Sequence, residues 1–169
     1  MFYGWENFFF MVGSASAGLI GLLFVVVTLT GSFDLDRAAR GQRLYMTPTA
    51  VLFTAVMTLS AAALAPGLPD RAEATITLLI ALIGLGWAGQ ACWGIAAMSR
   101  KEDAPHWSDF WLYGAAPAIA YAGLTAVAVA QCLHASWAIY ALAGLLMLML
   151  LVGIRNAWDL ITWMAPRRG

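Results

Sequence analysis

The chain has 169 residues, of which 62% are hydrophobic and only 11% are charged, and its formal net charge is zero. A mean hydropathy of +0.78 would leave large apolar patches in water, which excludes an ordinary water-soluble protein. The balanced charge gives no electrostatic reason to expect nucleic acid as a partner, so the composition predicts the lipid bilayer instead.

Five apolar stretches predict an all-α integral membrane protein, a bundle of five transmembrane helices. A helix needs about 20 apolar residues, at about 1.5 Å each, to cross a hydrocarbon core of about 30 Å. In chain order the predicted spans are residues 5–30, 47–65, 72–99, 107–132 and 136–163. No linker or internal repeat divides them, so residues 1–169 are expected to form a single five-helix membrane domain.

Local signals mark several helix ends. Pro66 and Gly67 are expected to stop the second helix, since proline cannot continue a helix and glycine favours the turn that follows one. Asp70 with Glu73 three residues later has the spacing of a capping box, which predicts the start of the third helix. Ser136 is the expected N-cap of the fifth.

The basic residues predict the orientation of these spans. Seven of them lie in the first gap, in the third gap and after the last span, against one in the gaps on the opposite side. The seven are Arg37, Arg40, Arg43, Arg100, Lys101, Arg167 and Arg168, and the one is Arg71. By the positive-inside rule the N-terminus is outside and the C-terminus is in the cytoplasm. Tryptophans are expected at both interfaces, with Trp5 and Trp137 outside and Trp107, Trp111, Trp158 and Trp163 inside.

On the first helix, small residues recur at four-residue spacing, at Gly13, Ala17 and Gly21, with Gly18 beside them. A ladder of this kind lets another helix backbone approach closely in lipid, so these residues are predicted to pack helices together. The ladder does not say whether the second helix belongs to the same chain.

Mild polar residues follow on the second and third helices. Thr54 and Thr58 form a hydroxyl stripe, and Gln90 is the amide at depth on the third helix. Each has two interpretations. Threonines can donate to the carbonyl one turn back and the amide can join helices, or all three can line a pore or cavity.

Pro117 lies about ten residues into the fourth span, on a helix face shared with Tyr113 and Tyr121. A proline there removes a backbone donor, so the helix is expected to bend and the carbonyl of Tyr113 to lose its usual partner. A bent helix with two phenol groups can open a cavity, which makes Tyr113, Pro117 and Tyr121 candidate cavity-lining residues.

The densest polar cluster lies at the predicted cytoplasmic end of the last helix and consists of Arg155, Asn156 and Asp159. Arg155 and Asp159 are four residues apart and therefore face each other along the helix. They are either an interfacial ion pair that ends the span, or the cytoplasmic mouth or docking site of an assembly.

Between the interfaces, the five spans are expected to hold no Asp, Glu, Lys, Arg or His, which disfavours an ion-coupled pump, a retinal protein and an intramembrane protease. Cys92 and Cys132 are predicted at opposite ends of the bundle, as are His106 and His134. A disulfide, a metal site and a haem clamped by the histidines are therefore not expected. The sequence predicts a protein that is not an enzyme, with no catalytic residue and no cofactor.

The segments 14–29 (SASAGLIGLLFVVVTL) and 153–163 (GIRNAWDLITW) resemble small, uncharacterised multi-span bacterial membrane proteins. This resemblance implies a multi-pass protein of the bacterial cytoplasmic (inner) membrane and brings no activity with it.

Two functional classes fit these features. The preferred one is a homo-oligomeric passive pore for small ions or solutes, formed by small-residue faces and mildly polar residues. The alternative is an accessory or structural subunit whose small-residue faces dock other chains of a larger membrane complex.

Overall fold

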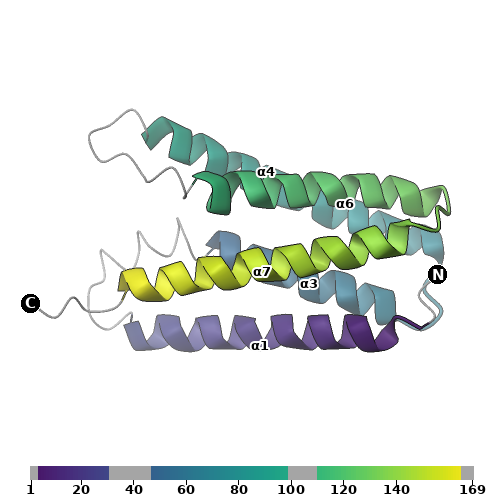
Figure 1. Ribbon diagram of the computed structural model, residues 1–169, viewed down its shortest axis with the longest axis horizontal. Coiled ribbons are helices and arrows are strands. Elements are labelled where there is room, and N and C mark those ends of the chain that lie inside the picture. The colour runs from purple at the N-terminus through teal and green to yellow at the C-terminus, as the bar shows by residue number, and fades with distance from the viewer. Residues whose placement is uncertain (1–3, 31–46, 99–109, 165–169) are drawn as a thin grey trace, which may run out of the picture.

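The computed structural model describes residues 4–30, 47–98 and 110–164, and in this part of the chain all regular structure is helical (Figure 1). The elements are α1 (Glu6–Thr30), α3 (Thr47–Leu64), α4 (Asp70–Met98), the π-helix η2 (Phe110–Ala115), α6 (Ala116–Cys132) and α7 (Ala138–Met164). The prediction of an all-α fold is confirmed, and the helix ends lie within three residues of the predicted spans. The basic loops, Trp107 and His106 lie outside the described residues.

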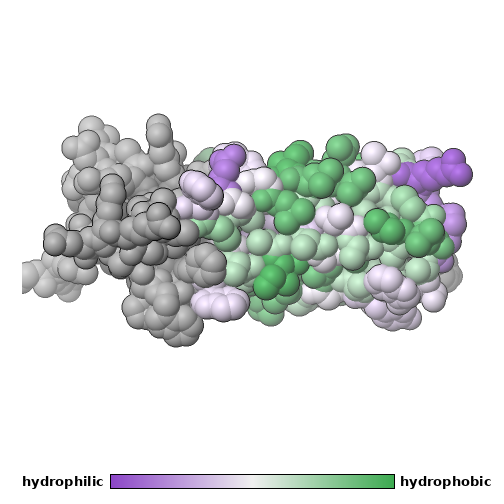
Figure 2. Space-filling model, turned by 90° about the horizontal axis from the view of Figure 1, so that it is seen from above, coloured by the Kyte–Doolittle hydropathy of each residue, from purple (hydrophilic) through white to green (hydrophobic). Residues whose placement is uncertain are grey.

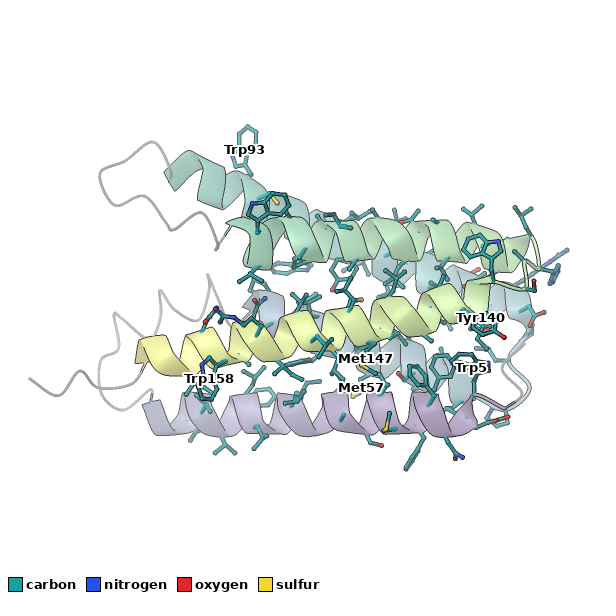
Figure 3. All side chains as sticks on the ribbon, in the orientation of Figure 1. Trp5, Met57, Trp93, Tyr140, Met147 and Trp158 are labelled. Atoms are coloured by element: carbon teal, nitrogen blue, oxygen red, sulfur yellow. The ribbon has the colours of Figure 1, made fainter. Side chains whose placement is uncertain are left out.

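Three of the helices, α1, α4 and α7, are long and apolar enough to cross a membrane, whereas α3 and α6 are shorter apolar helices. Figure 2 shows hydrophobic residues over the middle of one face and hydrophilic residues toward its ends. Aromatic side chains mark both ends of the bundle, with Trp5 and Tyr140 at one end and Trp93 and Trp158 toward the other (Figure 3). This distribution is typical of a protein that lies in a bilayer.

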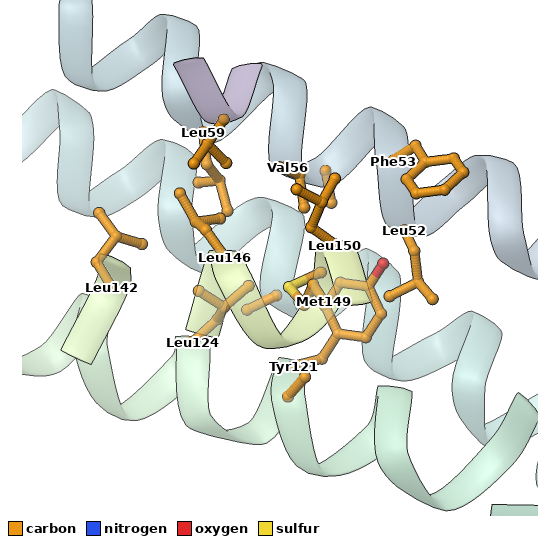
Figure 4. Close-up of a cluster of buried hydrophobic side chains, with 14 of the residues drawn as sticks. Leu52, Phe53, Val56, Leu59, Tyr121, Leu124, Leu142, Leu146, Met149 and Leu150 are labelled. Atoms are coloured by element: carbon orange, nitrogen blue, oxygen red, sulfur yellow. The ribbon is translucent and has the colours of Figure 1, made fainter. Parts of the chain in front are cut away.

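The five helices run side by side along the long axis and alternate in direction (Figure 1). α1 packs on α3 and α4 packs on α6. α7 contacts both pairs, through α6 on one side and through α3 and α1 on the other, and α3 also contacts α4. The core between the helices is filled with large apolar side chains, shown in Figure 4. Its fully buried members include Val56, Leu124, Leu142, Leu146 and Met149. Since side chains fill this space, the described interior of one chain offers no open polar path.

The turn between α3 and α4 follows the prediction. α3 ends at Leu64, and Gly67 has a φ of +72°, a left-handed conformation that glycine adopts without steric cost. The short turn returns the chain directly into α4, and it places α3 and α4 next to each other.

Pro117 lies at the start of α6 and not inside a regular α-helix, and this corrects the helix context of the prediction. The six residues before α6 form a π-helix, and Pro117 lies in the first turn of α6, where the missing amide costs little. In a π-helix the donor to a carbonyl is five residues on, so Pro117 deprives Leu112 rather than Tyr113. The side-chain amide of Asn156 on α7 donates to that Leu112 carbonyl at 3.1 Å. This hydrogen bond ties α7 to η2.

Candidate functional site

A groove of about 400 Å³ opens on the outer face of the bundle between α3 and α4. It lies near the middle of both helices, and its walls are almost entirely apolar. The lining residues are Ala50, Val51, Thr54, Ala55 and Thr58 from α3, Ile80, Ile83, Gly84 and Trp87 from α4, and Tyr121 from α6. We name this feature the α3–α4 groove.

Tyr121, on α6, reaches the α3–α4 groove because Gly84 of α4 has no side chain in its way. A Cβ built on Gly84 would lie 2.1 Å from Cε1 of the Tyr121 ring, so the ring rests directly against the backbone of α4. In Figure 4 the hydroxyl end of the Tyr121 ring points toward Leu52 of α3. Tyr121 is only 2% exposed, and its hydroxyl oxygen is buried without a hydrogen-bond partner in the described part of the chain. An unpaired buried hydroxyl costs about 1–3 kcal/mol relative to a paired one.

The polar residues predicted to line a pore share the outer face that carries the α3–α4 groove. Thr54 and Thr58 are exposed at its wall, and the Thr58 hydroxyl donates to the Thr54 carbonyl at 2.8 Å, as its position in a helix predicts. Gln90 is exposed on α4. It is seven residues after Ile83 and three after Trp87, which puts it on the same helix face, toward the end at Met98.

Of the three residues predicted to line a kink cavity, Tyr121 reaches the groove. Pro117 is buried at the start of α6, and it belongs to the junction with η2. The side chain of Tyr113 lies outside the described part of the structure. Gly84 and Trp87, which complete the groove, were not singled out from the sequence as site residues. Their spacing against Tyr121 depends on how α4 and α6 are aligned, and no local pattern reports that alignment.

A buried polar pair joins the first turn of α4 to the last turn of α6. The Gln131 side-chain amide donates to the Glu73 carboxyl at 3.1 Å, and the two residues are 2% and 6% exposed. Asp70 is already the first residue of α4, and the Pro69 carbonyl accepts from the amides of Ala72 and Glu73. The capping-box prediction is therefore wrong. Glu73 turns into the bundle instead of back to the helix end.

The pair buries an ionisable side chain at the end of the predicted span 72–99, and the expectation of no such side chain between the interfaces stays a prediction. Glu73 lies only one turn into α4 and was attributed to the helix cap, and Gln131 was missed entirely. Beside them, on the exposed end of the bundle, His134 Nδ1 lies 3.5 Å from an Asp70 carboxylate oxygen. The sequence contains an amide, Gln131, near the end of α6 and an acidic first turn in α4. Antiparallel packing of these two helices would have predicted that the two groups meet.

At the other end of the bundle, Arg155 donates to Asp159 on the exposed surface of α7, the pairing that their four-residue spacing predicts. Asn156 is separate from this pair, because it is fully buried and bonds to η2. The three residues predicted as one mouth or docking cluster therefore divide into an exposed ion pair and an internal tie between helices.

The small-residue ladder of α1 also divides. Gly13 faces α3, where a Cβ would lie 2.9 Å from Cβ of Ser60, and the adjacent Ser16 hydroxyl donates to the Phe53 carbonyl at 2.7 Å. Ala17 is exposed, and a Cβ on Gly18 or Gly21 would meet nothing within 4 Å. One edge of the ladder holds α1 against α3, and the rest faces outward.

Cys92 and Cys132 are free thiols, and in the described residues no group of three or more His, Cys, Asp or Glu side chains comes together to hold a metal. Comparisons with known protein families, with curated proteins and with solved structures found no match. The features of the chain that bear on its function are the groove, the exposed polar residues and the open helix faces.

Proposed function

We propose that all five helices span the bacterial cytoplasmic membrane, with the N-terminus outside and the C-terminus in the cytoplasm. The 18 residues of α3 measure about 27 Å at about 1.5 Å per residue, which matches a hydrocarbon core of about 30 Å. η2 and α6 continue one another from Phe110 to Cys132, and both shorter segments pack beside the three long apolar helices. The segments with seven of the basic residues follow α1, α4 and α7, which end at the same end of the bundle (Figure 1).

Reporter fusions test this topology. Fusions at Gly67 and Ala135 should read outside, and fusions at Gly31, Ala104 and Gly169 should read cytoplasmic. A cytoplasmic reading at Gly67 or Ala135 would remove α3 or α6 from the set of spans.

We propose further that the protein is a passive pore for small ions or solutes, built from several copies of the chain. The observation that supports this function is the outward position of Thr54, Thr58 and Gln90 on one face of a bundle whose core is filled mainly with apolar side chains. A path along these groups has to run between chains. Hydroxyl and amide dipoles with apolar constrictions are sufficient to gate and select in such a path, and no buried charge is required.

The exposed amide supports assembly independently of conduction. Gln90 has four hydrogen-bonding sites on a surface that faces lipid in a single chain, and burying an amide in hydrocarbon without partners is costly. Contact with a second chain removes that cost. The open positions at Gly86 and Gly89 next to it let another helix approach closely, since a Cβ there would meet nothing within 4 Å.

The test combines particle mass with conductance. Purified protein in nanodiscs should have the mass of a ring of identical chains, and planar bilayers should show conductance. Asp159→Asn removes one negative charge per chain at the inner end, so the reversal potential in a salt gradient should move toward anion selectivity. An assembled particle without conductance would refute the pore. Stoichiometric co-purification of unrelated chains would favour the alternative, an accessory subunit.

A further inference from the structure

We propose that the α3–α4 groove binds a lipid-soluble molecule with a carbonyl oxygen in its apolar body, and that the Tyr121 hydroxyl donates a hydrogen bond to this oxygen. A substituted quinone or aryl ketone is the chemical class that fits. The proposal uses the position of the groove in the membrane and does not depend on conduction or on self-association.

The unpaired hydroxyl supports the polar half of this proposal. Tyr121 is the middle residue of the helical segment 110–132, and its oxygen has no partner among the described residues although it is buried. The buried hydroxyls of Ser16 and Thr77 donate to backbone carbonyls. The buried Ser60 hydroxyl has no partner among the described residues either, but Ser60 faces Gly13 of α1 and does not line the groove. A buried polar group without a partner calls for an explanation, and a ligand that supplies an acceptor gives one.

The walls of the groove support the apolar half. Its volume of about 400 Å³ falls within the range of about 300–1,000 Å³ that is typical of small-molecule sites. Ile80, Ile83 and Val51 offer aliphatic contacts, and Trp87 adds an aromatic face at the rim. Thr58 offers no donor to a ligand, because its hydroxyl proton is already given to Thr54. Thr54 and Trp87 carry the other donors of the lining, and both are exposed. Tyr121 is the buried donor around which a ligand would orient.

Depth selects between the lipid-soluble classes. Tyr121 lies about 16 Å from either end of its segment at about 1.5 Å per residue, close to the middle of a hydrocarbon core of about 30 Å. Phospholipid headgroups and their ester carbonyls lie at the interface and do not reach this depth. Acyl chains do reach it, but they carry no acceptor and leave the hydroxyl unpaired. The acceptor must therefore belong to a molecule that buries its oxygen together with its apolar body.

Binding can be measured with a decyl-substituted 1,4-benzoquinone added to the full chain in phosphatidylcholine nanodiscs. A quinone quenches tryptophan fluorescence, so site binding appears as a saturable component above the quenching by probe dissolved in lipid. Trp87→Phe should remove most of that component, because Trp87 is the tryptophan at the groove. Decylbenzene, which has the same tail and no oxygen, should compete at least tenfold more weakly.

Two pairs of variants locate the site. Tyr121→Phe should weaken quinone binding about tenfold, or about 1.4 kcal/mol at 25 °C, without lowering the melting temperature, since it removes an unpaired polar atom. Tyr140→Phe makes the same change on an exposed tyrosine at the outer end and should leave binding unchanged. Thr54→Leu adds bulk at the groove wall and should abolish binding, whereas Thr54→Val keeps the shape and should retain it.

Three results would overturn the proposal. Wild-type affinity in a folded Tyr121→Phe variant would exclude the hydrogen bond. Equal competition by decylbenzene would reduce the groove to a slot for acyl chains. The absence of any saturable component would remove the site. None of these measurements uses conductance or particle mass. Refuting the pore would therefore not refute ligand binding in the groove, and refuting ligand binding would not refute the pore.

Discussion

The seam between α4 and α6 and the outer face of α1 use the same small residues for opposite purposes. Along the seam, side chains of the facing helix occupy the space beside Gly84 and Gly114. The Tyr121 ring lies on Gly84, and the Cys92 sulfur would be 2.7 Å from a Cβ on Gly114. On α1, Gly18 and Gly21 meet nothing. Glycine spacing therefore indicates a helix that can be approached closely, and only the position of the neighbour shows whether the approach has occurred within the chain.

The seam also shows how three local contacts set one register. Starting from the first turn of α4, the pairs are Glu73 with Gln131, Gly84 with Tyr121 and Cys92 with Gly114. The residue numbers rise along α4 and fall along α6 and η2. A polar pair, a ring on a glycine and a thiol on a glycine all require the same antiparallel alignment. No such set of contacts restrains the outward face of α1, which is free to meet lipid or another chain.

The largest expected effect is at the centre of the seam. Gly84→Ala should lower the free energy of unfolding by about 1–3 kcal/mol, because the added Cβ overlaps the Tyr121 ring and displaces it. Thermal or denaturant unfolding in detergent measures this change. Gly86→Ala is the matched control, and since nothing lies within 4 Å of its Cβ it should be neutral or stabilising by up to about 1 kcal/mol. Equal effects at both positions would contradict the packing of Tyr121 on Gly84.

A smaller effect is expected at the end of the seam where Gln131 meets Glu73. Gln131→Leu removes the donor to the buried Glu73 carboxyl and should cost about 1–2 kcal/mol of unfolding free energy, since the acceptor is left unpaired. Gln90→Leu makes the same change at an exposed position on α4 and should alter the unfolding free energy by less than about 0.5 kcal/mol. A larger loss of unfolding free energy for Gln90→Leu than for Gln131→Leu would contradict this comparison.

The smallest effect on the fold is expected on α1. Gly21→Leu should leave the unfolding free energy of one chain within about 0.5 kcal/mol of wild type, because its side chain enters open space. In nanodiscs the same variant should reduce the particle mass if this face meets a second chain, since the added bulk separates helices that rely on close contact. Gly144→Leu, at an open position on α7, is the control. An unchanged mass for Gly21→Leu would assign this face of α1 to lipid.

The sequence by itself determined the helical class and the approximate ends of the helices. It also determined the i, i+4 pairs of Thr54 with Thr58 and of Arg155 with Asp159. These features depend on length, hydropathy and helix periodicity, all of which are local. The tertiary structure decided the rest. Glu73 looked like a cap residue until Gln131 was placed beside it, and Tyr121 looked like part of a proline kink until Gly84 let it reach the α3–α4 groove. Each of these contacts joins residues at least 37 positions apart, and it depends on the alignment of α4 with α6, which no periodicity within either helix encodes.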